Sequence, residues 1–249
     1  MFGLKTRFRI CDLFGIPLYL DLSTIFIMLM FLQCGDIVLS VGLSLILAVS
    51  IVAHELGHSL TARCFGCRTT CITLTVIGGC ASMERIPRKG WQEFLVAAAG
   101  PAVSFVLGFS LYVSAVFVGG DNYLGITFLY GGIINITLGL FNLLPGFPMD
   151  GGRILRSVAR LFTTRAKATY VAMVVGRVSA VALVVLPLLG INHLWIIPIG
   201  GSLILRCLIA WMIWQDGYRE YLVARREEDF RSWSQDDFDA RVSPPPYER

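Results

Sequence analysis

Long uninterrupted apolar runs constrain this chain more than any other feature of its sequence. An α-helix needs roughly 20 mainly apolar residues to cross a hydrocarbon core about 30 Å thick. Six segments approach or exceed that length, at residues 18–33, 37–62, 93–118, 123–144, 168–189 and 194–214. The composition of the 249 residues, 55% hydrophobic and 15% charged, agrees with this pattern. We therefore predict an all-α polytopic membrane protein with six transmembrane helices.

The basic residues predict the orientation of these helices, because Lys and Arg beside membrane segments remain on the cytoplasmic side. They precede the first predicted helix, follow the second and the fourth, and recur after the sixth, whereas residues 34–36, 119–122 and 190–193 contain none. This predicts a multi-pass protein of the plasma membrane with both termini in the cytoplasm. The net charge of +4 requires no nucleic-acid partner. For Arg177 and Arg206, inside predicted helices, two interpretations stay open: snorkelling toward the interface, or a polar contact within the bundle.

Two segments depart from the helical pattern. Residues 69–83 are rich in β-branched residues and contain Gly78-Gly79, which predicts a strand and a glycine turn, a small membrane-associated β segment between the second and third helices. The edge of residues 70–77 is then available to an extended peptide by strand addition; a cytoplasmic hairpin without a role in the chemistry is the alternative. From residue 215 onward the sequence is polar and charged. We predict a transmembrane domain over 1–214 and a charged, partly disordered cytoplasmic tail over 215–249.

The second apolar run contains the sequence His54-Glu55-Leu56-Gly57-His58. Positions i and i+4 share one face of a helix, so both imidazoles can bind one metal ion while Glu55 lies beside it. The alternative is a pair of histidines held by hydrogen bonds in a polar interior. At 1.5 Å per residue from residue 37, His54 lies about 26 Å along its helix, within the inner half of the membrane. Ionisable groups at that depth indicate a functional site.

A catalytic zinc ion usually has three protein ligands and one open position. His193 falls in an outer loop of the predicted topology, so another donor is needed. Asp150 is the candidate, because Pro145, Gly146 and Pro148 and the two glycines after it interrupt the fourth helix and allow the chain to turn a carboxylate inward. A helix-capping or interfacial aspartate is the alternative. Asn142 could donate a hydrogen bond to a developing oxyanion or position a substrate; a packing role is equally compatible with the sequence.

Both stretches resemble the site-2 protease family of intramembrane zinc metalloproteases. In that family a H-E-x-x-H helix and an N-x-x-P-x-x-P-x-D-G segment form the active site together. The sequence here matches both in full, at residues 54–58 and 142–151. Gly78-Gly79, Glu93, Ala99-Gly100-Pro101 and the six-helix layout extend the resemblance to about residues 10–214.

The resemblance implies one Zn²⁺ per chain, bound by His54, His58 and Asp150, with Glu55 as the catalytic base. It also implies a membrane-anchored protein substrate cleaved within or near its transmembrane segment, as in regulated intramembrane proteolysis. Some members carry PDZ or CBS domains, and we expect the short form without them; a regulatory membrane partner is not specified. A proteolytically silent protein that binds transmembrane helices and a metal transporter are the competing functions. All of the motif residues are present, which disfavours the silent protein, and transport does not explain a glutamate directly after the first histidine.

Overall fold

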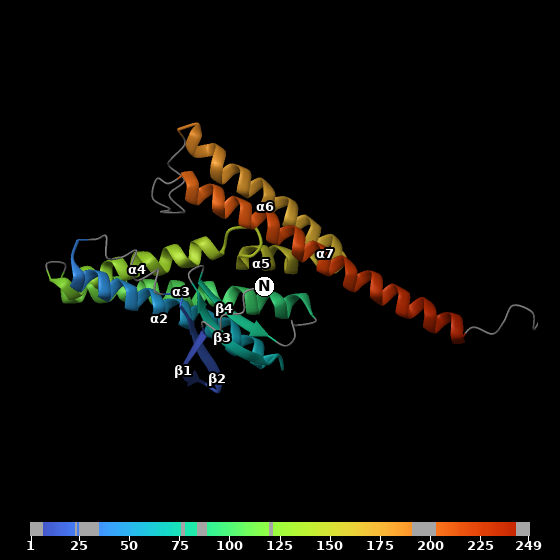
Figure 1. Cartoon of the computed structure of the whole chain (residues 1–249), viewed down its shortest axis with the longest axis horizontal. Coiled ribbons are helices and arrows are strands. Elements are labelled where there is room, and N and C mark those ends of the chain that lie inside the picture. The colour runs from blue at the N-terminus through green and yellow to red at the C-terminus, as the bar shows by residue number, and fades with distance from the viewer. Residues whose placement is uncertain are drawn as a thin grey trace, which may run out of the picture. The chain divides into compact units, whose positions relative to one another are not determined.

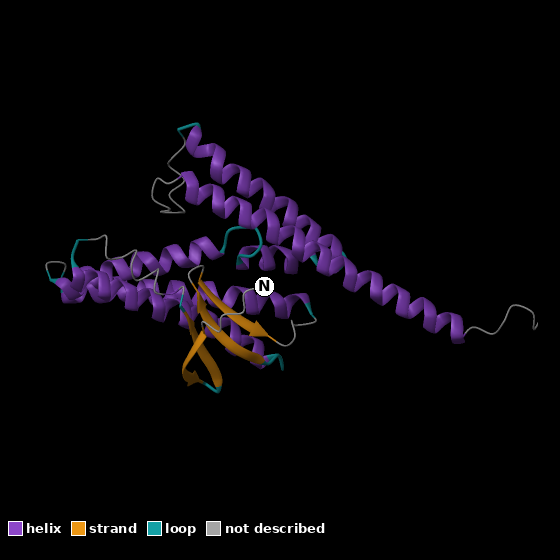
Figure 2. Ribbon diagram, viewed as in Figure 1, coloured by secondary structure: helices purple, strands orange, loops and turns teal. Residues whose placement is uncertain are grey.

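The computed structural model describes residues 7–22, 24, 35–75, 78–83, 89–119, 122–190 and 203–242. They form two compact units, which divide between Leu143 and Leu144. The first unit contains strands β1 (Arg7–Leu13), β2 (Ile16–Asp21), β3 (Thr69–Thr75) and β4 (Gly78–Met83), with helices α2 (Ile37–Cys64), α3 (Gly90–Val118) and α4 (Tyr123–Asn142). The second contains α5 (Asp150–Ala159), α6 (Arg165–Leu188) and α7 (Leu203–Val242). Figures 1 and 2 show these elements.

The described residues contain four helices long and apolar enough to span a membrane, namely α2, α3, α4 and α6. Their outward positions are apolar, as at Val49 on α2 and Phe117 on α3, which are 64% and 86% exposed. Their buried positions include serines, for example Ser44 and Ser104. Apolar side chains outside and small polar ones between the helices are typical of a protein solvated by lipid. Four of the six predicted spans are therefore confirmed as membrane-type helices.

The N-terminal end of α2 shows why this helix begins where the sequence predicts. Asp36 is the N-cap residue, and its Oδ1 accepts hydrogen bonds from the amides of Val38 at 2.8 Å and Leu39 at 3.0 Å. Such a cap satisfies two of the amides that a helix start leaves without partners. The helix then continues for 28 residues, which carries both histidines of the motif into the membrane-spanning segment.

Glycines bring the helices of the first unit into close contact. A Cβ on Gly108 of α3 would lie 3.1 Å from the carbonyl oxygen of Gly132 on α4, and one on Gly57 of α2 would lie 2.9 Å from that of Ala99 on α3. Helices in membranes associate through such small residues, because lipid offers no hydrophobic drive for their contact. The backbones of α2 and α3 are therefore close together at the level of the histidines.

The four strands form one sheet in the order β1-β2-β3-β4 (Figure 2). β1 and β2 form an antiparallel hairpin whose turn residues, Phe14 and Gly15, both have positive φ, as a type I′ turn requires. β2 pairs with β3 in parallel and β3 pairs with β4 antiparallel. Buried side chains of the sheet pack against Ile51 of α2, one turn before the motif; they are Ile16, Leu18, Ile72 and Leu74.

The sheet corrects two sequence-based predictions. Residues 18–21 belong to β2 and not to the start of a helix over 18–33; of residues 22–33 the structure describes only 22 and 24. Ile16 and Leu18 are buried alternately with less buried neighbours, so the period is that of a strand. The predicted strand over 69–83 is two strands, with Gly78 and Gly79 at the start of β4 and not in a turn. β3 has a neighbour on each side, so its edge is not available for strand addition.

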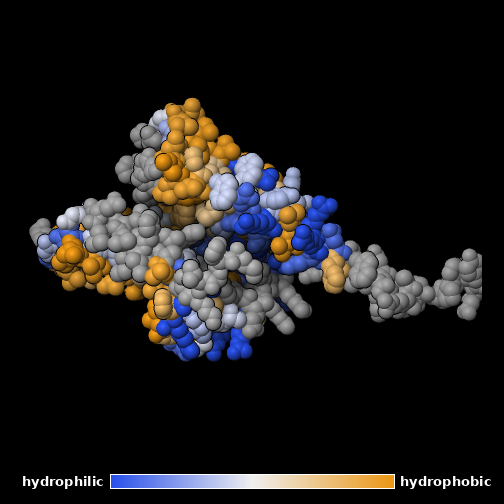
Figure 3. All heavy atoms as spheres, in the orientation of Figure 1, coloured by the Kyte–Doolittle hydropathy of each residue, from blue (hydrophilic) through white to orange (hydrophobic). Residues whose placement is uncertain are grey.

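In the second unit, α6 and α7 lie side by side (Figure 1). The guanidinium of Arg177 on α6 lies over the ring of Trp214 on α7, 4.5 Å from the ring centroid. Of the two open interpretations for this arginine, this cation–π contact agrees with a contact within the bundle. Of the predicted sixth span over 194–214, residues 203–214 belong to α7 and the others lie outside the described residues. α7 continues through residue 215 to Val242, and Figure 3 shows its apolar part giving way to hydrophilic residues.

Candidate metal centre

The two histidines of α2 lie together on one buried face of the helix. Each is 4% exposed, and their Nε2 atoms are 3.1 Å apart. Two ligand atoms on a tetrahedral zinc ion, each about 2.0–2.1 Å from the metal, lie about 3.3–3.4 Å apart. The two imidazoles are therefore close to the spacing that one metal ion needs.

Neighbouring groups on α3 orient both imidazole rings. Nδ1 of His58 lies 2.7 Å from the carbonyl oxygen of Val96, and Nδ1 of His54 lies 2.9 Å from Oγ of Ser104. A carbonyl only accepts hydrogen bonds, so Nδ1 of His58 must carry the proton and its Nε2 keeps a lone pair for a metal. The hydroxyl oxygen of Ser104 can accept a hydrogen bond from Nδ1 of His54 in the same way. Both Nε2 atoms converge and each Nδ1 has a partner on α3, an arrangement that a metal ion requires and that a hydrogen bond between the two rings also fits.

Gly100 of α3 lies directly in front of the two Nε2 atoms. A Cβ built on this glycine would lie 2.6 Å from Nε2 of His54 and closer still to Nε2 of His58. The space beside the imidazole nitrogens is thus kept open by the lack of a side chain. Paired nitrogen donors with oriented rings and open space before them fit a zinc ion.

Glu55, the middle residue of the motif, is half-buried on α2 beside the first strand residues of β4. A Cβ on Gly79 would lie 3.0 Å from Cδ of Glu55 and 2.9 Å from Cγ2 of Ile51. The backbone of β4 therefore lies against the glutamate side chain. Among the strands that the structure describes, β4 is also an edge strand of the sheet.

Asp150, the predicted third ligand, belongs to the second unit. It is the first residue of α5 and is 6% exposed; the N-cap residue is Met149, so Asp150 is not the capping aspartate of the alternative interpretation. The preceding loop packs tightly within its own unit. A Cβ on Gly152 would lie 2.6 Å from the carbonyl carbon of Gly146, and one on Gly146 would lie 3.0 Å from Cα of Gly176. The backbone on both sides of this carboxylate is therefore held in place.

Asn142, the predicted catalytic amide, is the last residue of α4. Its Nδ2 donates to the carbonyl oxygen of Leu138 at 3.0 Å, a bond within its own helix. The structure therefore brings His54 and His58 together, sets Glu55 against β4, and leaves the amide of Asn142 engaged locally.

Sequence reasoning missed the residues that orient the histidines. Ser104 and the carbonyl of Val96 lie on α3 and belong to neither of the two motifs. The available signal was the spacing of Gly100, Ser104 and Gly108 at intervals of four, which places small residues on one face of the helix. The contacts of Gly100 show that this glycine makes room for the imidazoles.

These features define a class: a membrane-spanning protein with a buried, metal-competent pair of histidines on one of its transmembrane helices. A family model described as peptidase family M50 matches residues 42–127 and 121–186. The chain belongs to this family, which is that of the site-2 proteases. The recognition made from the two motifs is thereby confirmed.

Individual relatives agree with the family model. A protein of Synechocystis sp. assigned as a zinc metalloprotease is 35% identical over 94% of this chain and 65% of its own length. A zinc metalloprotease of Methanocaldococcus jannaschii is 36% identical over 76% of this chain and 56% of its own length. The chain thus spans about three fifths of the length of these relatives. The solved structure of the site-2 protease from Methanocaldococcus jannaschii superposes with a TM-score of 0.60 and 31% identity, over 86% of this chain and 95% of that one.

Proposed function

We propose that this chain is an intramembrane zinc endopeptidase that hydrolyses a peptide bond within or near a transmembrane segment of a membrane-anchored protein. The observation that carries the proposal is the pair of buried Nε2 atoms 3.1 Å apart on a membrane-spanning helix, with Glu55 between them in sequence. The names of the relatives, zinc metalloproteases, support it.

In this proposal His54, His58 and Asp150 hold one zinc ion per chain. Support for Asp150 comes from its burial, from its place in a tightly packed loop and from the match of residues 142–151 to the family segment. A carboxylate ligand also lowers the net charge of the site, which favours a metal ion inside a membrane. When bound, zinc polarises the substrate carbonyl and lowers the pKa of a coordinated water to about 7.

Glu55 acts as the general base of the proposed reaction. It takes a proton from the attacking water and returns it to the amine of the departing peptide. Val96 and Ser104 keep the two imidazoles in the tautomer and orientation that leave Nε2 free. Asn142 is proposed to position the substrate or to donate to the developing oxyanion; for this its amide must leave the carbonyl of Leu138.

The substrate must be unwound before it is cleaved, because a helical peptide has its carbonyls in hydrogen bonds along the axis. We propose that β4, in place of the interior strand β3, receives the unwound segment by strand addition. The position of Gly79 against Glu55 supports this choice, since a peptide on that strand edge runs close to the base. In a strand, the amides of successive residues face opposite edges. Cys80 and Ala81 are successive residues of β4, so proline at one of these two positions removes an amide donor from the outer edge. That variant, Cys80→Pro or Ala81→Pro, is expected to impair cleavage and to retain zinc.

The remaining predictions from the sequence, on topology, location and domain division, are part of the same proposal. We propose six spans, a plasma-membrane location with both termini in the cytoplasm, the division into a transmembrane domain over 1–214 and a cytoplasmic tail over 215–249, and release of the cleaved product on the cytoplasmic side. The distribution of Lys and Arg supports this orientation. Reporter fusions at residues 35 and 120, expected outside, and at the C-terminus, expected inside, test it.

The test of the function uses the full chain in liposomes with a single-span substrate carrying helix-breaking residues. We expect one zinc per chain and cleavage by the wild type, and for Glu55→Gln retained zinc with cleavage lowered by at least about 100-fold. Glu227→Gln, a surface change on α7, is the matched control and should cleave normally. Zinc binding without cleavage of any single-span substrate would favour the silent helix-binding protein. Zinc flux that Glu55→Gln leaves unchanged would favour a transporter.

A further inference from the structure

Arg156 of α5 is an arginine buried in a place that the proposed chemistry does not use. Its side chain is 2% exposed, and its guanidinium lies 5.0 Å from the centroid of the Phe147 ring. Its NH1 donates to Oε2 of Glu220 on α7 at 2.8 Å. The arginine thus contacts both the loop that precedes Asp150 and the last helix of the second unit, α7.

A buried guanidinium needs a negatively charged partner, because its transfer from water is costly. Glu220 supplies that charge from the rim of the unit, with 41% of its side chain exposed. The ion pair fixes the direction of the arginine side chain, and the planar guanidinium then covers the Phe147 ring. Glu220 therefore acts on Phe147 through Arg156.

Phe147 can transmit a displacement to Asp150 because the loop between them has no spare room. The phenyl ring is 2% exposed, and Met149, the next residue but one, is 3% exposed. Gly146 is packed against both Gly152 and Gly176, with backbone atoms at distances that admit no Cβ. A close-packed segment moves as a block and does not absorb a local shift. A displacement of the Phe147 ring must therefore displace the carboxylate of Asp150, three residues later.

We propose that Arg156 and Glu220 are positioning residues for the carboxylate of Asp150, so that α7 sets the affinity of the site for its metal ion. The inference rests on the proposed function, in which Asp150 is a metal ligand. Groups that orient a metal ligand without touching the metal commonly change metal affinity about 10- to 100-fold when removed. The same scale is expected here.

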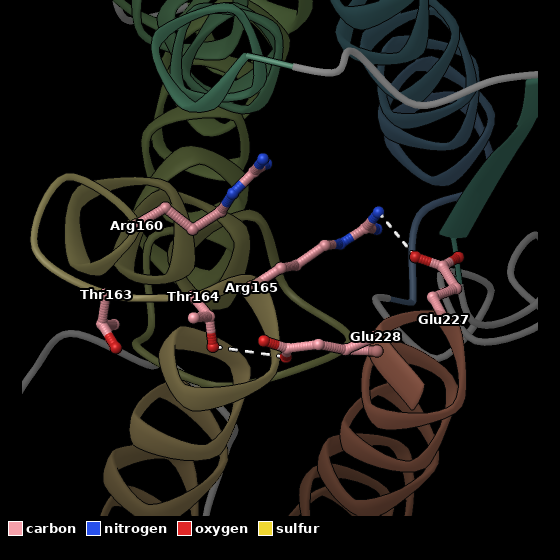
Figure 4. Close-up of a pocket in the computed structure, with 7 residues that line it drawn as sticks. Arg160, Thr163, Thr164, Arg165, Glu227 and Glu228 are labelled. Carbon is pink, nitrogen blue, oxygen red and sulfur yellow. Dashed lines mark hydrogen bonds and ion pairs between the residues drawn. The ribbon is translucent and has the colours of Figure 1, made fainter. Parts of the chain in front are cut away.

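The competing explanation is that the pair only docks α7 onto its unit. The chain offers a matched control, because a second Arg–Glu pair joins α7 to α6. Arg165 NH1 donates to Oε2 of Glu227 at 2.9 Å, and beside it Oε2 of Glu228 accepts from Oγ1 of Thr164 at 3.2 Å (Figure 4). The side-chain exposure of Glu227, 44%, is nearly that of Glu220. Removal of the Glu227 carboxylate weakens the contact of α7 with α6 and leaves the contact between Arg156 and Phe147 in place.

The experiment measures metal affinity on the full chain in lipid nanodiscs, by chelator competition with Zn²⁺ and by the absorption bands of bound Co²⁺. Glu220→Gln is expected to weaken the affinity about tenfold or more and to change the Co²⁺ spectrum. Glu220→Asp, which keeps the charge, should recover most of the affinity, and Glu227→Gln should stay within about twofold of the wild type. Arg156→Lys, which keeps the charge but loses the planar contact with Phe147, should weaken binding as well.

The outcomes separate this inference from the proposed function. Equal metal affinity and equal Co²⁺ spectra for Glu220→Gln and Glu227→Gln, while Asp150→Asn loses the metal, would overturn the positioning role and leave the ligand assignment standing. Asp150→Asn with the affinity of the wild type would overturn the ligand assignment, and the positioning role with it. If Glu220→Gln fails to fold, Arg156→Lys with wild-type affinity and spectrum contradicts the inference by itself.

Discussion

Replacing Gly100 by alanine tests the metal centre with a single methyl group. The new Cβ would lie 2.6 Å from Nε2 of His54 and 2.5 Å from Cε1 of His58, whereas ordinary contacts begin at 3.4 Å. The Cβ would lie closer still to Nε2 of His58, so relief requires the two rings to move by about 0.8–1.1 Å. Metal ligands tolerate deviations of about 0.2 Å. We therefore expect Gly100→Ala to lower zinc affinity by at least about 100-fold.

The same substitution should leave the fold largely intact. Overpacking a core costs about 1–3 kcal/mol, and alanine in place of glycine within a helix returns roughly 1 kcal/mol. Gly139→Ala is the matched control, because its Cβ would lie 2.9 Å from the Phe105 ring and would not approach the histidines. The assay is zinc retained per chain against a chelator series, with thermal unfolding measured in parallel.

Gly100→Ala and Gly139→Ala should differ in zinc binding and not in stability. Both should unfold within a few degrees of each other, and only Gly100→Ala should lose zinc. Wild-type zinc affinity in Gly100→Ala would show that the space before the imidazoles is not the metal site. Equal zinc loss in both variants would show that general packing between α3 and its neighbours, and not the position of the rings, controls binding.

Three further predictions follow from the described contacts. Ser104→Ala removes the partner of Nδ1 of His54 and should weaken zinc binding about 10- to 100-fold in chelator competition, and an unchanged affinity would mean that the serine does not orient the ring. Glu55→Gln should lower kcat with little change in KM, since the base acts in the chemical step and not in binding; a rise in KM alone would contradict this role. Hydrogen bonds from the amide of Leu39, the hydroxyl of Tyr123 and the amide of Val38 lower the pKa of Asp36 below its usual value. The folded-state pKa of Asp36 lies below its unfolded value of about 4. The stabilisation from the ionised carboxylate is therefore complete above that unfolded value and is lost as the pH falls through the folded pKa. The melting temperature of Asp36→Asn should accordingly depend less on pH below about 4 than that of the wild type.

The parts that sequence could predict are those governed by local patterns. α2 begins at Ile37, where the apolar run begins, and both motif histidines lie on its buried face. An i, i+4 pair and the length of an apolar run depend only on neighbouring residues, so they can be read without knowing the fold. The predicted spans from 93, 123 and 168 likewise correspond to α3, α4 and α6 within a few residues.

The complete sheet depends on contacts between distant segments, and local patterns predicted only its part in residues 69–83. β2 pairs with β3, so that Leu18 is the partner of Ile72. The alternation in residues 16–21 merges with the longer apolar run that follows, and a window long enough to detect a membrane helix averages it away. The interior position of β3 in the sheet order was for the same reason not accessible from residues 70–77 alone.

α7 shows a different limit. The change of composition at residue 215 predicts the end of a membrane segment, yet the helix continues to Val242. Charged residues spaced at three or four positions support a helix in water as well as in lipid; Arg219 and Asp216 form one such pair and Arg225 and Asp229 another. Composition therefore marks a change of environment and not a change of secondary structure.

Zinc K-edge X-ray absorption on the purified full chain identifies the ligands of the proposed zinc site. We expect one zinc with two imidazole nitrogens and two oxygens, one of them from Asp150, all at about 2.0–2.2 Å and without sulfur. Asp150→Asn should retain little zinc, and the zinc that it binds when supplied in excess should give a changed spectrum in which the signature of two imidazoles persists. Sulfur at about 2.3 Å, fewer than two imidazoles, or a spectrum that Asp150→Asn leaves unchanged would contradict the assignment of this site.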